Sequence, residues 1–130
     1  MKIGEVSEAT GISIPTLRHY DHVGLVSPSQ RTAGGFRLYS ELDFRRLKLI
    51  RRMKPLGFSL DDMRAYITAS ETLTAAASSQ AAIDAQDVAD AKKVKKNITE
   101  RALQSYETLQ RKLSYAKEFL ADLDATPHSS

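Results

Sequence analysis

No cysteine and no tryptophan occur among the 130 residues of the chain. The lack of cysteine excludes disulfides, thiolate metal ligands, iron–sulfur clusters held by thiolates, and a thiol as nucleophile or redox sensor. No stretch approaches the ~20 apolar residues that a membrane-spanning helix needs. The first residues, MKIGEVSEATG, also lack the apolar core of a signal peptide. We therefore expect a soluble, cytoplasmic protein with no membrane partner.

Glycine and proline are absent from residues 58–126, whereas all six glycines and three of the four prolines lie before residue 58. Charge is uneven as well. Residues 1–70 contain 11 Lys and Arg and 7 Asp and Glu, a net charge of +4, and residues 71–130 contain 8 and 9, a net charge of −1. A basic, turn-rich half is therefore followed by a half suited to long helices.

Two short helices are predicted at the start of the chain. Apolar residues at helical spacing indicate the first over residues 2–10, and Gly11 follows where a left-handed residue ends a helix. Ser13 can cap the second helix, Pro15 suits its first turn, and Gly24 stops it. Two short helices joined by a tight turn form a helix-turn-helix candidate.

A small hairpin, or wing, is predicted between residues 25 and 39. Leu25 and Val26 form a β-prone run before the break at residues 27–29. A second β-prone run, residues 36–39, follows the glycine pair at 34–35. The wing is expected to present its glycine-containing tip to another molecule.

Serine caps predict two further helices. Ser40 opens one that ends at residues 55–57, and Ser59 opens the next, with Asp62 placed as in a capping box. The residues expected on the buried sides are Leu42, Leu47, Ile50 and Met53 in the earlier helix, and Leu60, Met63, Tyr66 and Ile67 in the later one.

A coiled-coil seam runs through the second half, where apolar residues repeat every three or four positions from Ala91 to Leu123. A helix from Ala85 to Leu123 is about 58 Å long, too long to be explained by packing on one small domain, so it needs a partner helix. We expect a homodimer, and the seam alone fits parallel or antiparallel pairing. The residues predicted at the dimer interface are Val94, Ile98, Ala102, Tyr106, Leu109, Leu113, Ala116 and Leu120.

These patterns predict a mainly α fold with four parts. Residues 1–69 form a winged helix-turn-helix domain, and residues 70–84, rich in Ala, Ser and Thr, form a linker or a short helix. Residues 85–124 form the dimerisation helix, and residues 125–130 form a flexible tail that contains His128.

The basic surface of the first half indicates DNA. By spacing alone, Arg18 is either a phosphate or base contact or a solvated helical arginine. The wing favours the first of these roles, because Arg31 and Arg37 add positive charge and Phe36 adds a flat apolar face beside the glycine pair at 34–35. This combination suits a DNA backbone and minor groove.

The runs TLRHYDHVGLVSP and RTAGGFRLYS resemble the MerR family of bacterial transcription regulators, whose pattern there is close to (I/L)RYYE…GL(I/L)…P…R…(G)YR.Y. The resemblance continues through DFRRLKLIRRMKPLGFSLDDM and into the long helix. It implies a winged helix-turn-helix domain and an antiparallel coiled-coil dimer. It also implies binding to double-stranded promoter DNA with an unusually long spacer, which is bent and untwisted so that RNA polymerase can use it.

The resemblance also implies the DNA contacts and two departures from them. Arg18 matches the arginine of the family's recognition helix, and Tyr39 matches a structural tyrosine of the wing. His19 stands where Tyr or Phe is usual, and Phe36 stands where Tyr is usual, so it lacks a hydroxyl that could bond phosphate. The residues expected to bind DNA are Thr16, Arg18, His19, Tyr20, Arg31, Gly35, Phe36 and Arg37.

No inducing signal is indicated. Family members that sense metals or thiol stress use cysteine, and members that bind drugs carry a large additional C-terminal domain, so neither mechanism is implied here. We expect no cofactor and no metal. His19, Asp21 and His22 could be imagined as metal ligands, but residues on a recognition helix can equally face solvent or DNA. A small-molecule effector stays unknown.

The residues Met53, Phe58, Met63 and Tyr66 form either a small-molecule pocket or, as is usual for such residues at helical spacing, hydrophobic core. No enzyme motif is present. The competing functions are a coiled-coil interaction module and, among DNA-binding proteins, an effector-independent repressor instead of a ligand-switched activator.

Overall fold

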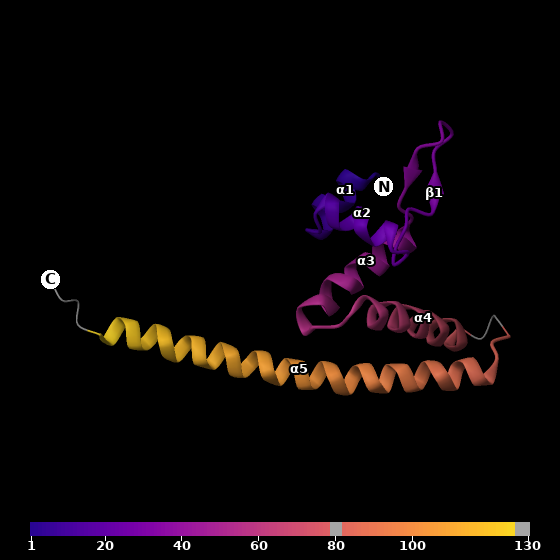
Figure 1. Ribbon diagram of the computed structural model, residues 1–130. Coiled ribbons are helices and arrows are strands. Elements are labelled where there is room, and N and C mark those ends of the chain that lie inside the picture. The colour runs from indigo at the N-terminus through magenta and orange to yellow at the C-terminus, as the bar shows by residue number, and fades with distance from the viewer. Residues whose placement is uncertain (79–81, 127–130) are drawn as a thin grey trace.

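The computed structural model describes residues 1–78 and 82–126. Most of the predicted tail at 125–130, with His128, lies outside the described residues. The fold is mainly α, with a winged helix-turn-helix region and a long C-terminal helix, as predicted. Figure 1 shows the short helices and the wing stacked above the long helix, which continues well past them toward the C-terminus.

The helix-turn-helix consists of α1 (Ile3–Thr10) and α2 (Ile14–His22). Gly11 ends α1 with a left-handed backbone at φ +75°, a conformation that costs glycine no steric penalty. The Ser13 side chain caps α2 by accepting a hydrogen bond from the Thr16 backbone N–H at 3.2 Å. Leu17 is fully buried in the core beneath α2. The sequence signals for both helices are therefore confirmed.

The wing pairs β1 (Gln30–Arg31) with β2 (Arg37–Leu38) in antiparallel register. The prediction of a strand at Leu25 and Val26 was wrong. Both residues are buried, and their backbone N–H groups donate to the Tyr20 carbonyl at the end of α2, at 2.9 and 3.4 Å. Because these N–H groups bond to the last turn of α2, they are not available for a strand. Leu25 and Val26 are core residues, and the first strand begins later, at Gln30.

Helices α3 (Glu41–Met53) and α4 (Leu60–Ala77) are joined by η1, a 3-10 turn at Lys54–Leu56. Both α-helices start with the predicted serine caps. Most of the predicted apolar faces are inward, with Leu47, Ile50, Met53, Met63 and Ile67 buried and Leu60 and Tyr66 half-buried.

Leu42 is the exception among these apolar residues, since it is 41% exposed. Its neighbour Asp43 takes the inward position and is 1% exposed. One carboxylate oxygen, Oδ2, accepts hydrogen bonds from the Ser29 hydroxyl at 2.6 Å, the Ser29 backbone N–H at 3.0 Å and the Ser40 backbone N–H at 2.8 Å. A single buried carboxylate thus joins the start of the wing to the start of α3.

Burial by itself raises the pKa of Asp43, but the hydrogen bonds from Ser29 and Ser40 outweigh it, so the pKa lies below its ordinary value of 3.8. These bonds stabilise the charged form.

Helix α5 (Ala85–Ala125) runs back beneath α4 (Figure 1). Ala91 and Ile98 are buried, and Val94 and Ala102 pack partly buried against the same core. The length argument was therefore too strong for the first half of the seam, because α4 of the same chain covers it. Helix α4 also continues to Ala77, through a segment that the sequence left open as linker or helix.

An ion pair reinforces this contact between α4 and α5. Arg101 donates two hydrogen bonds to the Asp62 carboxylate, at 2.9 and 2.7 Å, and its guanidinium lies over the Phe58 ring at 5.1 Å. The hydrogen bonds from Arg101 hold the pKa of Asp62 well below its usual range. The start of α4 is thus attached to the middle of α5.

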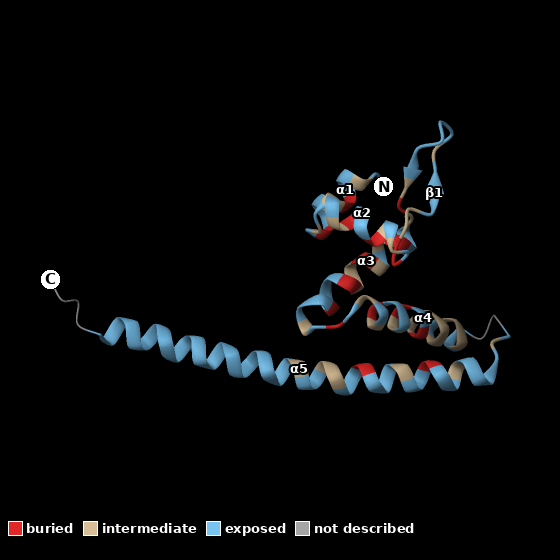
Figure 2. Cartoon of the chain, in the orientation of Figure 1, coloured by how far each residue is buried: buried red, intermediate tan, exposed pale blue. Residues whose placement is uncertain are grey.

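The second half of α5 lacks such cover in this single chain. Figure 2 shows it exposed along its whole length. The large apolar residues exposed there are Leu103, Tyr106, Leu109, Leu113, Tyr115, Phe119, Leu120 and Leu123. The later seam positions predicted from the sequence lie in this half, and no side chain among the described residues buries them.

Replacing Asp43 with Asn should lower the free energy of unfolding by about 2 kcal/mol, because neutral acceptors bind the buried donors more weakly than a carboxylate does. Urea denaturation at neutral pH measures the change. The folded pKa is below the unfolded one, so the wild-type advantage is complete at neutral pH and shrinks as acid protonates Asp43. Glu41→Gln, at the exposed first turn of α3, is the control and should change stability little; equal effects of both variants would contradict this role.

Candidate nucleic-acid interface

The exposed side of α2 carries the first group of predicted contacts. Arg18 and His19 are exposed, and Thr16 is half-buried with its hydroxyl accepting a hydrogen bond from the Ser13 hydroxyl at 2.8 Å. Tyr20 is different, since only 3% of its surface is accessible. The ring of Tyr20 therefore belongs to the core beneath α2.

The wing tip carries the second group. Phe36 is 73% exposed, so its ring projects into solvent. Its backbone N–H donates to the Thr32 hydroxyl at 3.1 Å, and the Gly35 N–H donates to the Thr32 carbonyl at 2.9 Å. Gly35 has φ +86°, which favours glycine at this turn. Arg31 donates to the Gly35 carbonyl at 3.2 Å, so the tip is braced by its own side chains.

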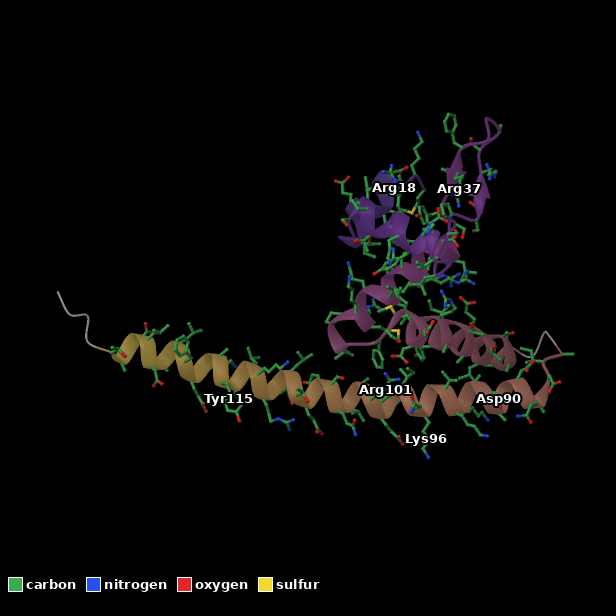
Figure 3. The ribbon with its side chains drawn as sticks, in the orientation of Figure 1. Arg18, Arg37, Asp90, Lys96, Arg101 and Tyr115 are labelled. Carbon is green, nitrogen blue, oxygen red and sulfur yellow. The ribbon has the colours of Figure 1, made fainter. Side chains whose placement is uncertain are left out.

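Arg37 joins the two groups. Its two terminal nitrogens donate to the two carboxylate oxygens of Asp21, at 2.9 and 3.1 Å, and Asp21 belongs to α2. The Arg37 hydrogen bonds lower the pKa of Asp21, and the same bonds raise the pKa of Arg37. Figure 3 shows Arg18 of α2 and Arg37 of the wing both at the end of the molecule far from α5. The structure thus gathers the predicted helix and wing residues on one basic face.

Backbone contacts from two other arginines hold this face in place. Arg51 of α3 donates to the Thr10 carbonyl at 2.8 Å, and Arg64 of α4 donates to the Val23 carbonyl at 2.9 Å. Sequence reasoning missed both roles, since arginines in a basic helix pattern carry no sign of which carbonyl they reach. From the sequence, Asp21 was considered only as a metal ligand. Its position on the recognition helix, directly after Tyr20, was the available sign of a role beside the basic face.

The cluster of Met53, Phe58, Met63 and Tyr66 belongs mainly to the core. Met53, Phe58 and Met63 are buried in the central cluster, and Tyr66 packs partly buried against it. Phe58 and Met63 also line one wall of an open surface groove of about 510 Å³ between α2 and α4. Core packing is therefore the main role of these side chains.

Neither a metal centre nor a membrane span is found in the part of the chain that the structure describes. Within 1–78 and 82–126, no group of three or more His, Asp or Glu side chains could hold a metal ion. No helix in the same ranges is long and apolar enough to cross a membrane.

Two protein-family models match the chain. Residues 1–70 match the model described as MerR HTH family regulatory protein. The chain belongs to the MerR family. Residues 44–126 also match the family model described as MerR, DNA binding. The resemblance seen in the sequence is confirmed, and the basic face lies within the range that the HTH model matches.

Curated MerR relatives match parts of the chain. Nodulation protein NolA from Bradyrhizobium elkanii is 43% identical over 72 residues, which are 55% of this chain and 33% of NolA. The transcriptional regulator HmrR from Sinorhizobium medicae is 34% identical over 90 residues, 69% of this chain and 61% of HmrR. The transcriptional activator mta from Bacillus subtilis is 44% identical over 63 residues, 48% of this chain and 24% of mta. The chain spans about a third of NolA and three-fifths of HmrR.

Solved MerR structures match nearly the whole chain. MtaN, the N-terminus of the multidrug transporter activator of Bacillus subtilis, is 29% identical with a TM-score of 0.51, and the match covers 99% of each chain. HiNmlR, a MerR regulator lacking the sensor domain and bound to promoter DNA, has a TM-score of 0.67 and covers 95% of this chain and 89% of HiNmlR. At 24% identity, HiNmlR supports the fold alone.

The buried position of Tyr20 gives a prediction about its role. Tyr20→Phe should leave affinity for duplex DNA within about twofold of the wild type, because the ring remains in the core, whereas Tyr20→Ala should destabilise the fold by about 3 kcal/mol through the cavity it leaves. Fluorescence anisotropy and thermal unfolding measure the two effects. A large loss of DNA affinity in a stable Tyr20→Phe protein would show that the hydroxyl contacts DNA.

Proposed function

We propose that two copies of this chain form a dimer that binds a pseudo-palindromic promoter site and regulates transcription by bending and untwisting the spacer DNA. MerR membership supports DNA binding and regulation. The observation that carries the proposal further is that one chain has two exposed surfaces. One is the basic face, and the other is an apolar stripe along the second half of α5, formed by Tyr106, Leu109, Leu113, Ala116 and Leu120. A DNA reader and a pairing surface on the same chain fit a two-fold regulator.

The basic face fits a duplex in two ways. Arg18 on α2 is placed to reach phosphate or base edges in the major groove, and the projecting Phe36 with Arg31 fits the sugar–phosphate backbone beside it. Thr16, His19, Gly35 and Arg37 complete the surface that we assign to DNA. Tyr20 supports it from the core.

The apolar stripe fits a second copy. Tyr106, Leu109 and Leu113 are 55%, 40% and 56% exposed, and the stripe continues through Ala116 and Leu120. Exposed apolar surface of this extent marks an interaction site. An antiparallel pair of α5 helices would cover both stripes with one self-complementary contact. Val94, Ile98 and Ala102, which already touch α4, would lie at the margin of this contact.

The proposed regulatory step acts on the DNA between the two half-sites. Two recognition helices at a fixed separation hold two half-sites, and distortion of the uncontacted DNA between them changes the relation of the promoter elements to RNA polymerase. Such a protein acts in the cytoplasm, where bacterial promoters are. The relative mta is an activator, which supports activation here. An effector-independent repressor would use the same surfaces, and a coiled-coil interaction module would leave the basic face without a role.

Arg18→Ala should weaken binding to duplexes selected from a random pool by about tenfold or more, since one good bidentate contact contributes roughly 1–3 kcal/mol. Binding by the wild type should also weaken steeply with salt, because phosphate contacts release counterions. Fluorescence anisotropy at several salt concentrations measures both. Lys96→Ala is the matched control, since Lys96 projects from the opposite side of the molecule (Figure 3). Equal losses in both variants would contradict the assigned face.

Leu113→Asp should convert the dimer to a monomer, because it places a charge in the apolar contact between two α5 helices. Analytical ultracentrifugation measures the mass in solution. Tyr115→Asp is the matched control, because Tyr115 is also exposed but follows Leu113 by two residues, about 200° around the helix, and so lies off the stripe. A monomeric wild type, or dissociation by both variants alike, would remove the dimer from the proposal.

A further inference from the structure

The ion pair of Asp21 and Arg37 is unusual in its position. It joins the recognition helix to the wing, and among the described residues no other ion pair does so. It also places a negative charge within the surface assigned to a polyanion. A carboxylate at that point repels DNA phosphates. Attraction to DNA therefore cannot explain why Asp21 lies there.

The geometry of the pair is that of phosphate recognition. Both terminal nitrogens of Arg37 are used, each on a different oxygen of Asp21, at 2.9 and 3.1 Å. The same planar fork binds two phosphate oxygens in a protein–DNA complex. Asp21 therefore occupies the donors that a DNA phosphate would take.

A second positive charge lies across the hairpin. Arg31 is the direct register partner of Arg37, so the two side chains share one face of the wing. Like charges in directly opposite positions destabilise a two-stranded pair. Asp21 offsets this repulsion in the free protein, as a bound phosphate would when DNA is present.

The pair is also open to exchange. The Arg37 side chain is 47% exposed and the Asp21 side chain is 26% exposed, so a phosphate can approach the guanidinium. Ion pairs at this exposure contribute little net stability, because water and salt screen them. Breaking the ion pair therefore lowers the stability of the protein little, provided that a phosphate takes both hydrogen bonds that Arg37 had donated to Asp21.

We propose that Asp21 is a specificity-determining positioning residue that acts on Arg37 as an internal substitute for a DNA phosphate. On arbitrary DNA, Arg37 stays paired with Asp21 and adds no attraction. Only a backbone that brings a phosphate to the wing draws Arg37 away. Asp21 thus suppresses binding to arbitrary sequence. This inference rests on the proposed function, since it requires the basic face to bind DNA.

The test measures binding of a random-sequence duplex to the full chain as a function of salt. Asp21→Asn keeps the shape of the side chain and removes its charge, so it frees the charge of Arg37. The variant should bind the duplex more tightly, and the slope of log affinity against log salt should steepen by about 0.9, which is one more phosphate neutralised. Between about 200 and 50 mM salt, the variant should gain roughly threefold more affinity than the wild type does.

Four further variants isolate the cause. Asp90→Asn removes one negative charge on α5, far from the wing (Figure 3), and should leave the slope unchanged. Asp21→Glu restores a carboxylate and should return the slope toward that of the wild type. Asp21→Asn should change the slope less in an Arg37→Gln background than in the wild type, because Asp21 acts mainly through Arg37.

The outcomes separate this inference from the proposed function. If the wild type binds with a clear salt slope but Asp21→Asn has the slope of Asp90→Asn, or a shallower one, Asp21 does not restrain Arg37 and the inference fails alone. Circular dichroism checks that the Asp21→Asn protein is folded, and Asp21→Glu, which keeps the negative charge, should not show the change in slope. If no variant and no wild-type protein binds duplex DNA with a salt dependence, the proposed function fails and the inference fails with it.

Discussion

The contact between α4 and the first half of α5 determines how the two surfaces of the molecule are related. Ile98 of α5 is buried in the core of the N-terminal region, so the long helix shares that core instead of following it on a tether. The paired Arg101 and Asp62, with Phe58 beneath the guanidinium, attach α5 where α4 begins. The direction in which the apolar stripe leaves the domain is therefore set by packing, and so is its orientation relative to α2.

The basic face depends on negative charge as much as on positive charge. Asp43 fixes the residues just before β1, because one of its oxygens accepts three hydrogen bonds. Asp21 fixes β2, because its carboxylate binds Arg37. The burial of Asp43 is tolerated because its charge is met by hydrogen-bond donors that would otherwise lack a partner. The wing is thus fixed at both strands by carboxylates that come from the adjacent helices α2 and α3.

Local signals in the sequence were sufficient for most of the fold. Ser13, Ser40 and Ser59 each cap the helix that they predict, because capping needs only residues within one turn. Long-range facts were not available in the same way. Leu25 and Val26 are β-prone in isolation, but their N–H groups donate hydrogen bonds to the Tyr20 carbonyl near the end of α2. The seam of α5 is uniform in sequence, and the covered part gives way to the uncovered part where α4 begins, at the pair of Arg101 and Asp62.

Helix α5 also acts as a lever. From Ala102, near its attachment to the core, to its end at Ala125 it extends about 35 Å, and the turn around η1 lies beside only the first part of this stretch, at residues 104–112. A rotation of about 5° at the attachment would move the far end by roughly 3 Å, close to the rise of one base pair. In a two-fold assembly, small adjustments of side-chain packing around Arg101 would then be converted into changes of spacing between the two recognition helices.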